Sequence, residues 1–138
     1  MGAAITGVVG ILIQPWNLVS DPSHYMELWL TSYSSLLGAI GGILIADYYV
    51  IRKTELIVAD LYRREGQYWY SSGFNPIAII AFFVAVAPCV PGFVGKLFPV
   101  VDVGNFWLDV YTYAWFVSFG IAFSLYVIGM IALKSSRK

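Results

Sequence analysis

Few side chains in this sequence could do chemistry, and Asp47 has the most unusual position among them. It follows 19 residues without a charge, Leu28 to Ala46. An ionisable group at the end of an apolar segment either takes part in ion or proton transfer or pairs with a nearby charge. Arg52 and Lys53 follow within about two helical turns. We therefore expect Asp47 to pair with these cations or with a neighbouring helix, with direct cation binding as the alternative.

The other candidate groups do not form a reactive set. The single histidine, His24, is expected in an outer loop without a partner for a proton relay. The single cysteine, Cys89, excludes an internal disulfide and is expected to be a buried, small apolar residue. Asp109 is expected in the first turn of a helix, where the dipole favours a negative charge. The sequence shows no nucleophile–base pair, phosphate loop or metal cluster, so it predicts no enzyme, metal site or cofactor.

Hydroxyl groups and glycines are concentrated in one apolar segment. The polar side chains occupy positions 31–35, and Gly38, Gly41 and Gly42 follow. Because Gly38 and Gly42 are four residues apart, one face of a helix would be nearly bare backbone. Two interpretations stay open: a helix that flexes beside a water-accessible path, or static close packing of helices.

The composition indicates a membrane protein. Hydrophobic residues make up 59% of the 138 residues, charged residues 12%, and eight basic residues balance eight acidic ones. The mean hydropathy is +0.76. These values exclude a disordered chain, a disulfide scaffold and a basic nucleic-acid binder. A chain of this length cannot hide so much apolar surface in one soluble core. The predicted partner is therefore the lipid bilayer and not nucleic acid.

Long uncharged runs predict the elements that position these groups. Spanning a bilayer takes about 20 apolar residues in a helix. Continuous apolar runs predict an all-α integral membrane protein with three full transmembrane helices, at about 28–51, 76–95 and 107–133. The Asn75-Pro76 step is expected to start the second, and Pro88 and Pro91 are expected to kink its outer end. The apolar segment at about 2–14 is too short to cross, so we expect it to be the end of a helix whose beginning is absent.

Basic residues predict the orientation. Seven of the eight lie in the loop 52–73 or in the tail 134–138, and only Lys96 lies in an opposite connection. Positive charge accumulates on the cytoplasmic side of membrane proteins. We therefore expect a multi-pass protein of the plasma membrane (the inner membrane of a bacterial cell), with the loop 52–73 and the C-terminus in the cytoplasm.

Two stretches carry motifs in a characteristic order. The run from Leu36 to Ile43 is followed by Ala46-Asp47-Tyr48-Tyr49-Val50-Ile51-Arg52. It is similar to the pattern G-P-x-x-G-I…D-Y-Y-x-x-R of the nucleobase:cation symporters, which are the cytosine, purine, uracil, allantoin and hydantoin permeases, with Ala39 where that family often has proline. The pattern D-L-Y…G-x-Y…G-x-N…A is matched by Asp60-Leu61-Tyr62, Gly66-Gln67-Tyr68, Gly73-Phe74-Asn75 and Ala78. The Gln14-Pro15-Trp16 step is also similar, and the likeness covers about residues 10–82.

The resemblance implies a twelve-helix transporter with two inverted five-helix repeats, like the leucine transporters, of which this chain is the C-terminal part. Its partners would be the missing N-terminal helices and a nucleobase-like substrate. The substrate and the coupling cation, Na⁺ or H⁺, would bind on helices outside this fragment, so no substrate-binding residue is carried over. The helix at 28–51 would act as an outer gate through Leu28, Trp29, Leu30 and Tyr33, with Gly38, Gly41 and Gly42 as flexing or packing positions. Asp47, Tyr48, Tyr49 and Arg52 would form the inner-end motif of the family.

An alternative from another class remains open. The chain could be a small autonomous multi-pass protein that acts as an assembly or accessory subunit, by packing through the Gly38/Gly42 face.

Overall fold

The computed structural model describes residues 2–12, 16, 21–63, 66 and 68–136, and within these ranges the regular structure is helical. Ser71 and Phe74 form an isolated β-bridge. The elements are α1 (Gly2–Leu12), α3 (Pro22–Ile45), the π-helical turn η1 (Ala46–Ile51), α4 (Val58–Leu61), α5 (Pro76–Val86), α6 (Cys89–Leu97), α7 (Asn105–Thr112) and α8 (Ala114–Ser136).

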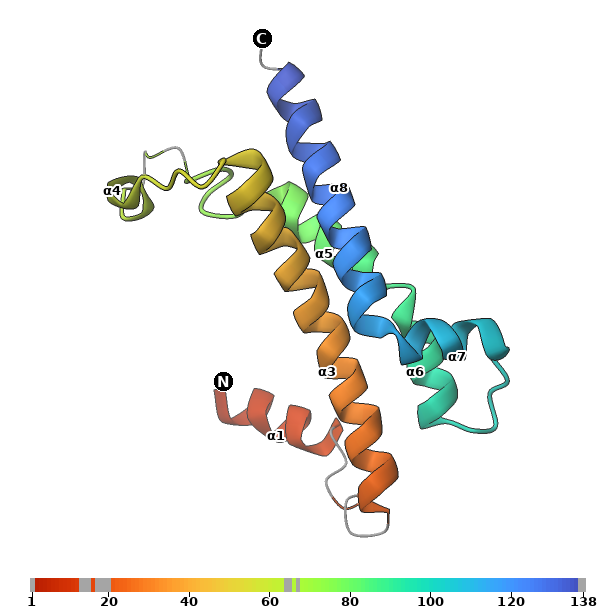
Figure 1. Cartoon of the computed structure of the whole chain (residues 1–138). Coiled ribbons are helices and arrows are strands. Elements are labelled where there is room, and N and C mark those ends of the chain that lie inside the picture. The colour runs from red at the N-terminus through yellow and green to blue at the C-terminus, as the bar shows by residue number, and fades with distance from the viewer. Residues whose placement is uncertain (1, 13–15, 17–20, 64–65, 67, 137–138) are drawn as a thin grey trace.

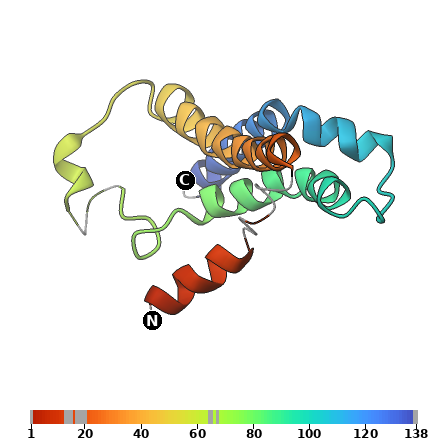
Figure 2. The ribbon, with the colours of Figure 1, turned by 90° about the horizontal axis from the view of Figure 1, so that it is seen from below.

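Two long helices form the centre of the molecule. Helices α3 and α8 lie side by side, and α5 packs against both (Figure 1). Helices α6 and α7 pack on each other at one end of this bundle. At the other end η1 packs against α8, and the segment with α4 extends sideways from there (Figure 1). Helix α1 has no buried residue and lies apart from the bundle in both views (Figures 1 and 2).

Two of these segments are long enough and apolar enough to cross a membrane. They are Pro22–Ile51, with 30 residues, and Ala114–Lys134, with 21 residues. Helices α5 and α6 form a pair bent by 45°, which makes a third crossing if the pair is one span. The architecture is therefore that of an all-helical membrane protein with two or three crossings among the described residues.

Several predicted boundaries differ from the structure. Helix α3 begins at Pro22 and not at residue 28, because the Asp21 carboxylate accepts a hydrogen bond from the backbone N–H of His24 and caps the helix. The prediction that His24 lies in a loop is therefore wrong. The predicted helix 107–133 is interrupted at Tyr113, and Asp109 lies in the middle of α7 and not in a first turn.

The remaining differences concern the ends of the other helices. The segment predicted at 76–95 is two helices that reach Leu97, and α1 ends at Leu12. Residues 13–15, and so the Gln14-Pro15 part of the family motif, lie outside the described residues. The same holds for Gln67 and for three of the basic residues that predicted the orientation, Arg64, Arg137 and Lys138.

The start and the bend of the α5–α6 pair follow from the sequence as predicted. The Asn75 side chain accepts hydrogen bonds from the backbone N–H groups of Ile77 and Ala78, and Pro76 takes the first helical position. The pair breaks between Val86 and Cys89, beside Pro88, because proline lacks a backbone donor and clashes with the preceding turn.

Close packing of α3 on α8 depends on two glycines. A Cβ atom at Gly38 would lie 2.5 Å from the backbone oxygen of Trp115, and one at Gly42 would lie 2.5 Å from that of Phe119. Gly41 faces elsewhere, with its nearest neighbour, a Phe119 ring carbon, at 3.9 Å. The structure thus shows close helix packing at Gly38 and Gly42, one of the two interpretations of these glycines.

Candidate functional site

The C-terminal end of α3, where it continues into η1, carries a polar network around Asp47. One carboxylate oxygen accepts a hydrogen bond from the hydroxyl of Tyr126 on α8, at 2.7 Å, and the other accepts from the guanidinium of Arg52. The Asn75 amide donates to the Tyr126 hydroxyl at 3.0 Å. Because Asn75 also caps α5, this network joins η1, α8 and the start of α5. The expected ion pair of Asp47 is therefore present and includes a neighbouring helix.

Arg52 extends the network into the connecting loop. Its guanidinium donates to the Tyr70 hydroxyl at 2.7 Å and stacks over the Tyr68 ring at 4.1 Å. Burial by itself lowers the pKa of Arg52, but the hydrogen bond to Asp47 and the nearby oxygens of Tyr70, Asp47 and Tyr68 outweigh it, so the pKa lies above its ordinary value. Arg52 therefore stays charged and holds the loop against the end of α3.

The backbone at this end is a π-helical turn. In η1 the N–H of Arg52 bonds to the carbonyl of Asp47 at 2.9 Å, five residues back. Such turns are rare and are frequently found at functional sites. The wider turn places Asp47 toward Tyr126 and leaves the Tyr48 and Tyr49 rings exposed. These two rings make an edge-to-face contact, with their centroids 5.0 Å apart.

The N-terminal half of α3 carries a second polar cluster. The buried Tyr111 hydroxyl of α7 donates to the carbonyl of Leu28 at 2.7 Å and lies 2.7 Å from the Ser32 hydroxyl. Ser32 also donates to the Leu28 carbonyl, at 2.8 Å. The cluster therefore ties the N-terminal half of α3 to the C-terminal end of α7.

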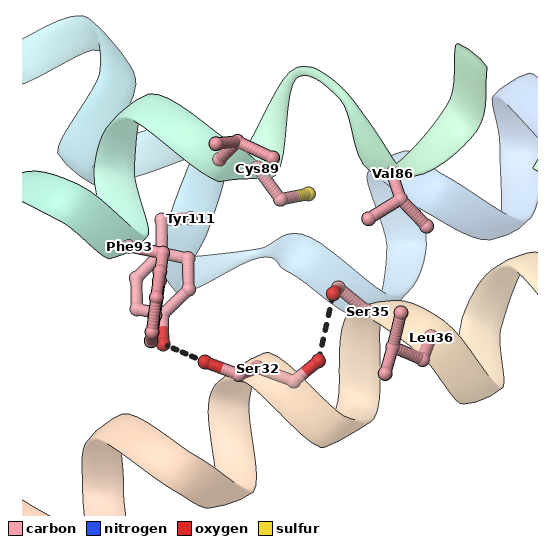
Figure 3. A pocket seen from close by; sticks show the side chains of 8 residues that line it. Ser32, Ser35, Leu36, Val86, Cys89, Phe93 and Tyr111 are labelled. Atoms are coloured by element: carbon pink, nitrogen blue, oxygen red, sulfur yellow. Dashed lines mark hydrogen bonds between the residues drawn. The ribbon is translucent and has the colours of Figure 1, made fainter. Parts of the chain in front are cut away.

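A cavity of about 140 Å³ lies beside this cluster, between α3 and the break of the α5–α6 pair (Figure 3). Its wall is mainly apolar, and the Ser32 and Ser35 hydroxyls that reach it already hydrogen-bond to protein groups. The lining residues are Ser32, Ser35, Leu36, Val86, Cys89, Val90, Phe93 and Tyr111. Cys89 is buried, as predicted, and its thiol points toward the backbone oxygen of Ala114 at 3.9 Å. The described residues include no group of His, Cys, Asp and Glu that could hold a metal ion.

The four predicted gate residues lie on two sides of α3. Leu28 is buried against α6 and α7. The Trp29 ring packs edge-on against the Phe93 ring, with the ring centroids 6.4 Å apart. Leu30 and Tyr33 are 65% and 64% exposed and have no part in this packing. The structure thus brings Leu28 and Trp29 into the bundle and leaves Leu30 and Tyr33 on an open surface.

Two tyrosines that organise these clusters were not predicted as site residues. Tyr111 and Tyr126 are 97–98% buried and each bonds to a residue 79 positions away. Local spacing does not reveal such pairs. The one available signal was a phenol within an apolar helix, which needs a hydrogen-bond partner when buried.

Comparisons with known proteins agree with the resemblance found in the sequence. Residues 1–118 match the family described as permeases for cytosine/purines, uracil, thiamine and allantoin. A purine-uracil permease of Arabidopsis thaliana is 42% identical over 134 residues, which cover 96% of this chain and 22% of the relative. A uracil permease of Saccharomyces cerevisiae is 29% identical, covering 91% and 20% respectively. An allantoin permease of Bacillus subtilis is 34% identical, covering 94% and 24%.

The chain spans about a fifth of the length of these relatives. No solved structure matches it significantly. The relatives are named permeases, which are transporters and not enzymes, so the prediction against an enzyme is confirmed and the accessory-subunit alternative is not favoured. The chain belongs to the family of permeases for cytosine/purines, uracil, thiamine and allantoin.

Proposed function

We propose that this chain is the C-terminal part of a secondary active transporter that imports a nucleobase or a related cyclic ureide by cation symport with alternating access. The match of residues 1–118 to the permease family carries this proposal, together with relatives named for purines, uracil and allantoin. No covalent step is needed, because the cation gradient supplies the free energy. The coupling cation, Na⁺ or H⁺, and the substrate would bind mainly on N-terminal helices that complete the twelve-helix protein, without a further cofactor.

The proposed orientation places the loop 52–73 and the C-terminus in the cytoplasm of a plasma-membrane protein. Arg52, Lys53 and Lys134 lie toward the end of the bundle that holds η1 and the C-terminus (Figure 1). Lys96 is at the opposite end, where it pairs with Glu27 at 3.8 Å. This charge distribution supports the orientation through the positive-inside rule.

Uptake by the intact transporter tests the proposed function directly. Cells that lack their own nucleobase uptake would express the intact protein and be offered radiolabelled cytosine, uracil, adenine, allantoin and hydantoin, with and without a Na⁺ or H⁺ gradient. We expect saturable uptake of at least one compound that is lost when its coupling gradient is collapsed. Absence of uptake for the whole panel, with the protein present in the plasma membrane, would contradict the proposal.

The isolated chain of 138 residues is expected not to transport. The proposal places the substrate and cation sites on other helices, and the outward faces of Leu30 and Tyr33 have no partner within this bundle. Purified chain in liposomes should show no uptake above protein-free liposomes for any compound of the panel. Saturable, cation-dependent uptake by the chain alone would show that these residues contain a complete pathway.

The outer half of α3 is proposed as a gate over the bound substrate. Leu30 and Tyr33 have the exposed surface that such contact requires, while Leu28 and Trp29 hold the same half against α6 and α7. Gate closure contributes to transport only if the substrate favours the closed state, since a ligand shifts populations by its differential affinity alone.

Substitution of Leu30 tests the gate. In the intact transporter, Leu30→Ala should raise the KM for uptake or the substrate leak by about fivefold, because losing the burial of about one methylene group on closure costs roughly 1 kcal/mol. Membrane insertion should be unchanged. Leu44→Ala is the matched control, since Leu44 is 63% exposed on the inner half of the same helix, and its effect should be smaller. Uptake kinetics identical to wild type in Leu30→Ala would remove the gate assignment.

A further inference from the structure

Two helix breaks divide the bundle at one level. The α5–α6 pair breaks between Val86 and Cys89, and the α7–α8 segment breaks at Tyr113. The cavity of about 140 Å³ touches the first break through Val86 and Cys89 and reaches α7 at Tyr111. Helices α6 and α7 therefore form a hairpin whose two connections to the long helices are both interrupted. Figure 1 shows this hairpin turned away from the axis of α8.

Separate packing clusters lie on either side of this level. The outer cluster consists of Leu28, Cys89, Tyr111 and Ala114, with Phe93 and Leu97 against it. Two further clusters lie on the inner side: Ala39 with Ala85 and Ala122, and Ala46 with Ala81 and Tyr126. The Asp47 network joins Tyr126 of the second to η1 and to the start of α5. The outer half of α3 with α6, α7 and Ala114, the first residue of α8, is called the outer block below. The inner block consists of η1, α5, the rest of α8 and the inner half of α3.

Tyr111 is the residue at which the three parts of the outer block meet. Its Cβ occupies the space that a Cβ on Gly92 of α6 would need, and the backbone oxygen of Trp107 lies there too. Its ring packs against the Phe93 ring, with the ring centroids 6.3 Å apart. Its hydroxyl donates to the Leu28 carbonyl of α3 at 2.7 Å. It also lies 2.7 Å from the Ser32 hydroxyl (Figure 3). Tyr111 is therefore fixed on α6 at its base and bonded to α3 at its tip.

The hydrogen bonds around the Tyr111 hydroxyl depend on one another. Three oxygen atoms, of Tyr111, Ser32 and the Leu28 carbonyl, lie within 2.7–2.8 Å of one another. The two hydroxyls supply only two protons for these three contacts. Removal of the Tyr111 hydroxyl leaves the single bond from Ser32 to the carbonyl of its own helix, so every polar bond of this cluster between α3 and α7 is lost.

We propose that Tyr111 is a positioning residue that couples the α6–α7 hairpin to the outer half of α3, so that the outer block moves as one body against the inner block when the gate opens and closes. The inference rests on the proposed gate function of α3. The cavity lies where the two blocks meet, so a change in their angle alters the space around Cys89. Tyr111 acts through Leu28 and Ser32 and touches no substrate in this arrangement.

Reactivity of Cys89 tests the coupling. The intact transporter in membranes would be treated with a small membrane-permeant maleimide, and labelling of Cys89 would be taken as the labelling lost in a parallel Cys89→Ala version. The substrate would be uracil, or allantoin if the uptake panel shows that allantoin is the transported compound. In wild type, a saturating concentration should change the rate of Cys89 labelling, because movement of the gate also moves α6. In Tyr111→Phe the labelling rate without substrate should rise about fivefold, as expected for the loss of one net hydrogen bond. The effect of the substrate on labelling should then disappear.

Two further variants separate coupling from general loosening. Tyr113→Phe removes a neighbouring hydroxyl from a side chain that is 62% exposed, and it should behave as wild type. Ser32→Ala keeps the Tyr111 bond to the Leu28 carbonyl and should retain the effect of the substrate. The proposal is overturned if the substrate alters Cys89 labelling equally in wild type and Tyr111→Phe, or in neither. If no compound of the panel binds, the proposed function fails, whereas the labelling rate without substrate still decides the coupling.

Discussion

Gly42→Leu is expected to abolish stable folding of the helix bundle. A Cβ at this position would lie 2.5 Å from the backbone oxygen of Phe119 and 3.1 Å from the backbone nitrogen of Phe123. These atoms belong to the backbone of α8 and cannot rotate away, so α3 and α8 would have to separate along their main contact. Overpacking of a well-packed core costs about 1–3 kcal/mol even where side chains can adjust, and the cost here should be larger. The fraction of monodisperse protein after detergent extraction, measured by size-exclusion chromatography, should fall at least tenfold.

Gly41→Leu and Gly120→Leu are the controls for this prediction. The nearest atom to a Cβ at Gly41 is 3.9 Å away, and nothing lies within 4 Å of one at Gly120. Both variants place the same side chain on the same two helices, so they match the change in helix propensity and hydrophobicity. Similar yields for Gly42→Leu and Gly41→Leu would show that α3 and α8 do not pack through the Gly42 face.

Asp47→Ala should give the second largest effect, a loss of stability at the inner end of the bundle. The Arg52 and Asp47 side chains are 14% and 23% exposed, and the carboxylate also accepts from Tyr126. Removing one partner leaves the guanidinium partly buried without its counter-charge, which costs about 3 kcal/mol for a buried pair. We expect a lower apparent Tm of the intact transporter in detergent and slower or absent uptake. The loop that Arg52 holds through Tyr68 and Tyr70 should become more sensitive to proteolysis.

The chain contains its own control for Asp47. Glu27 and Lys96 form an ion pair at 3.8 Å with side chains that are 70% and 38% exposed, and such pairs contribute at most about 1 kcal/mol. Glu27→Ala should therefore change the Tm much less than Asp47→Ala does. If the two variants lower the Tm equally, the network at Asp47 is not a structural centre of this end.

Local sequence was enough to predict most of the elements. Long uncharged runs predict membrane helices because the bilayer core excludes charge and requires internal backbone hydrogen bonds. The start of α5 at Asn75-Pro76 and the break near Pro88 depend on chemistry within one helical turn, so they could be predicted. The pairing of Asp47 with Arg52 is also local, since the two are five residues apart. The order of motifs from Leu36 to Ala78 similarly indicated the permease family.

Two helix boundaries were not predicted. The early start of α3 has a local cause, the Asp21 cap before Pro22, whereas apolar composition continues through the break at Tyr113. Other features depend on which helix faces which. Tyr111 bonds to Ser32 and Leu28, which are 79 and 83 residues away. Tyr126 bonds to Asp47 and Asn75, which are 79 and 51 residues away. A membrane helix is apolar on all sides, so its pattern does not say which side packs against protein. The sequence by itself therefore determined the membrane helices, their charge asymmetry and the family, whereas the tertiary structure decided the two tyrosine-centred clusters, because only packing selects the facing surfaces.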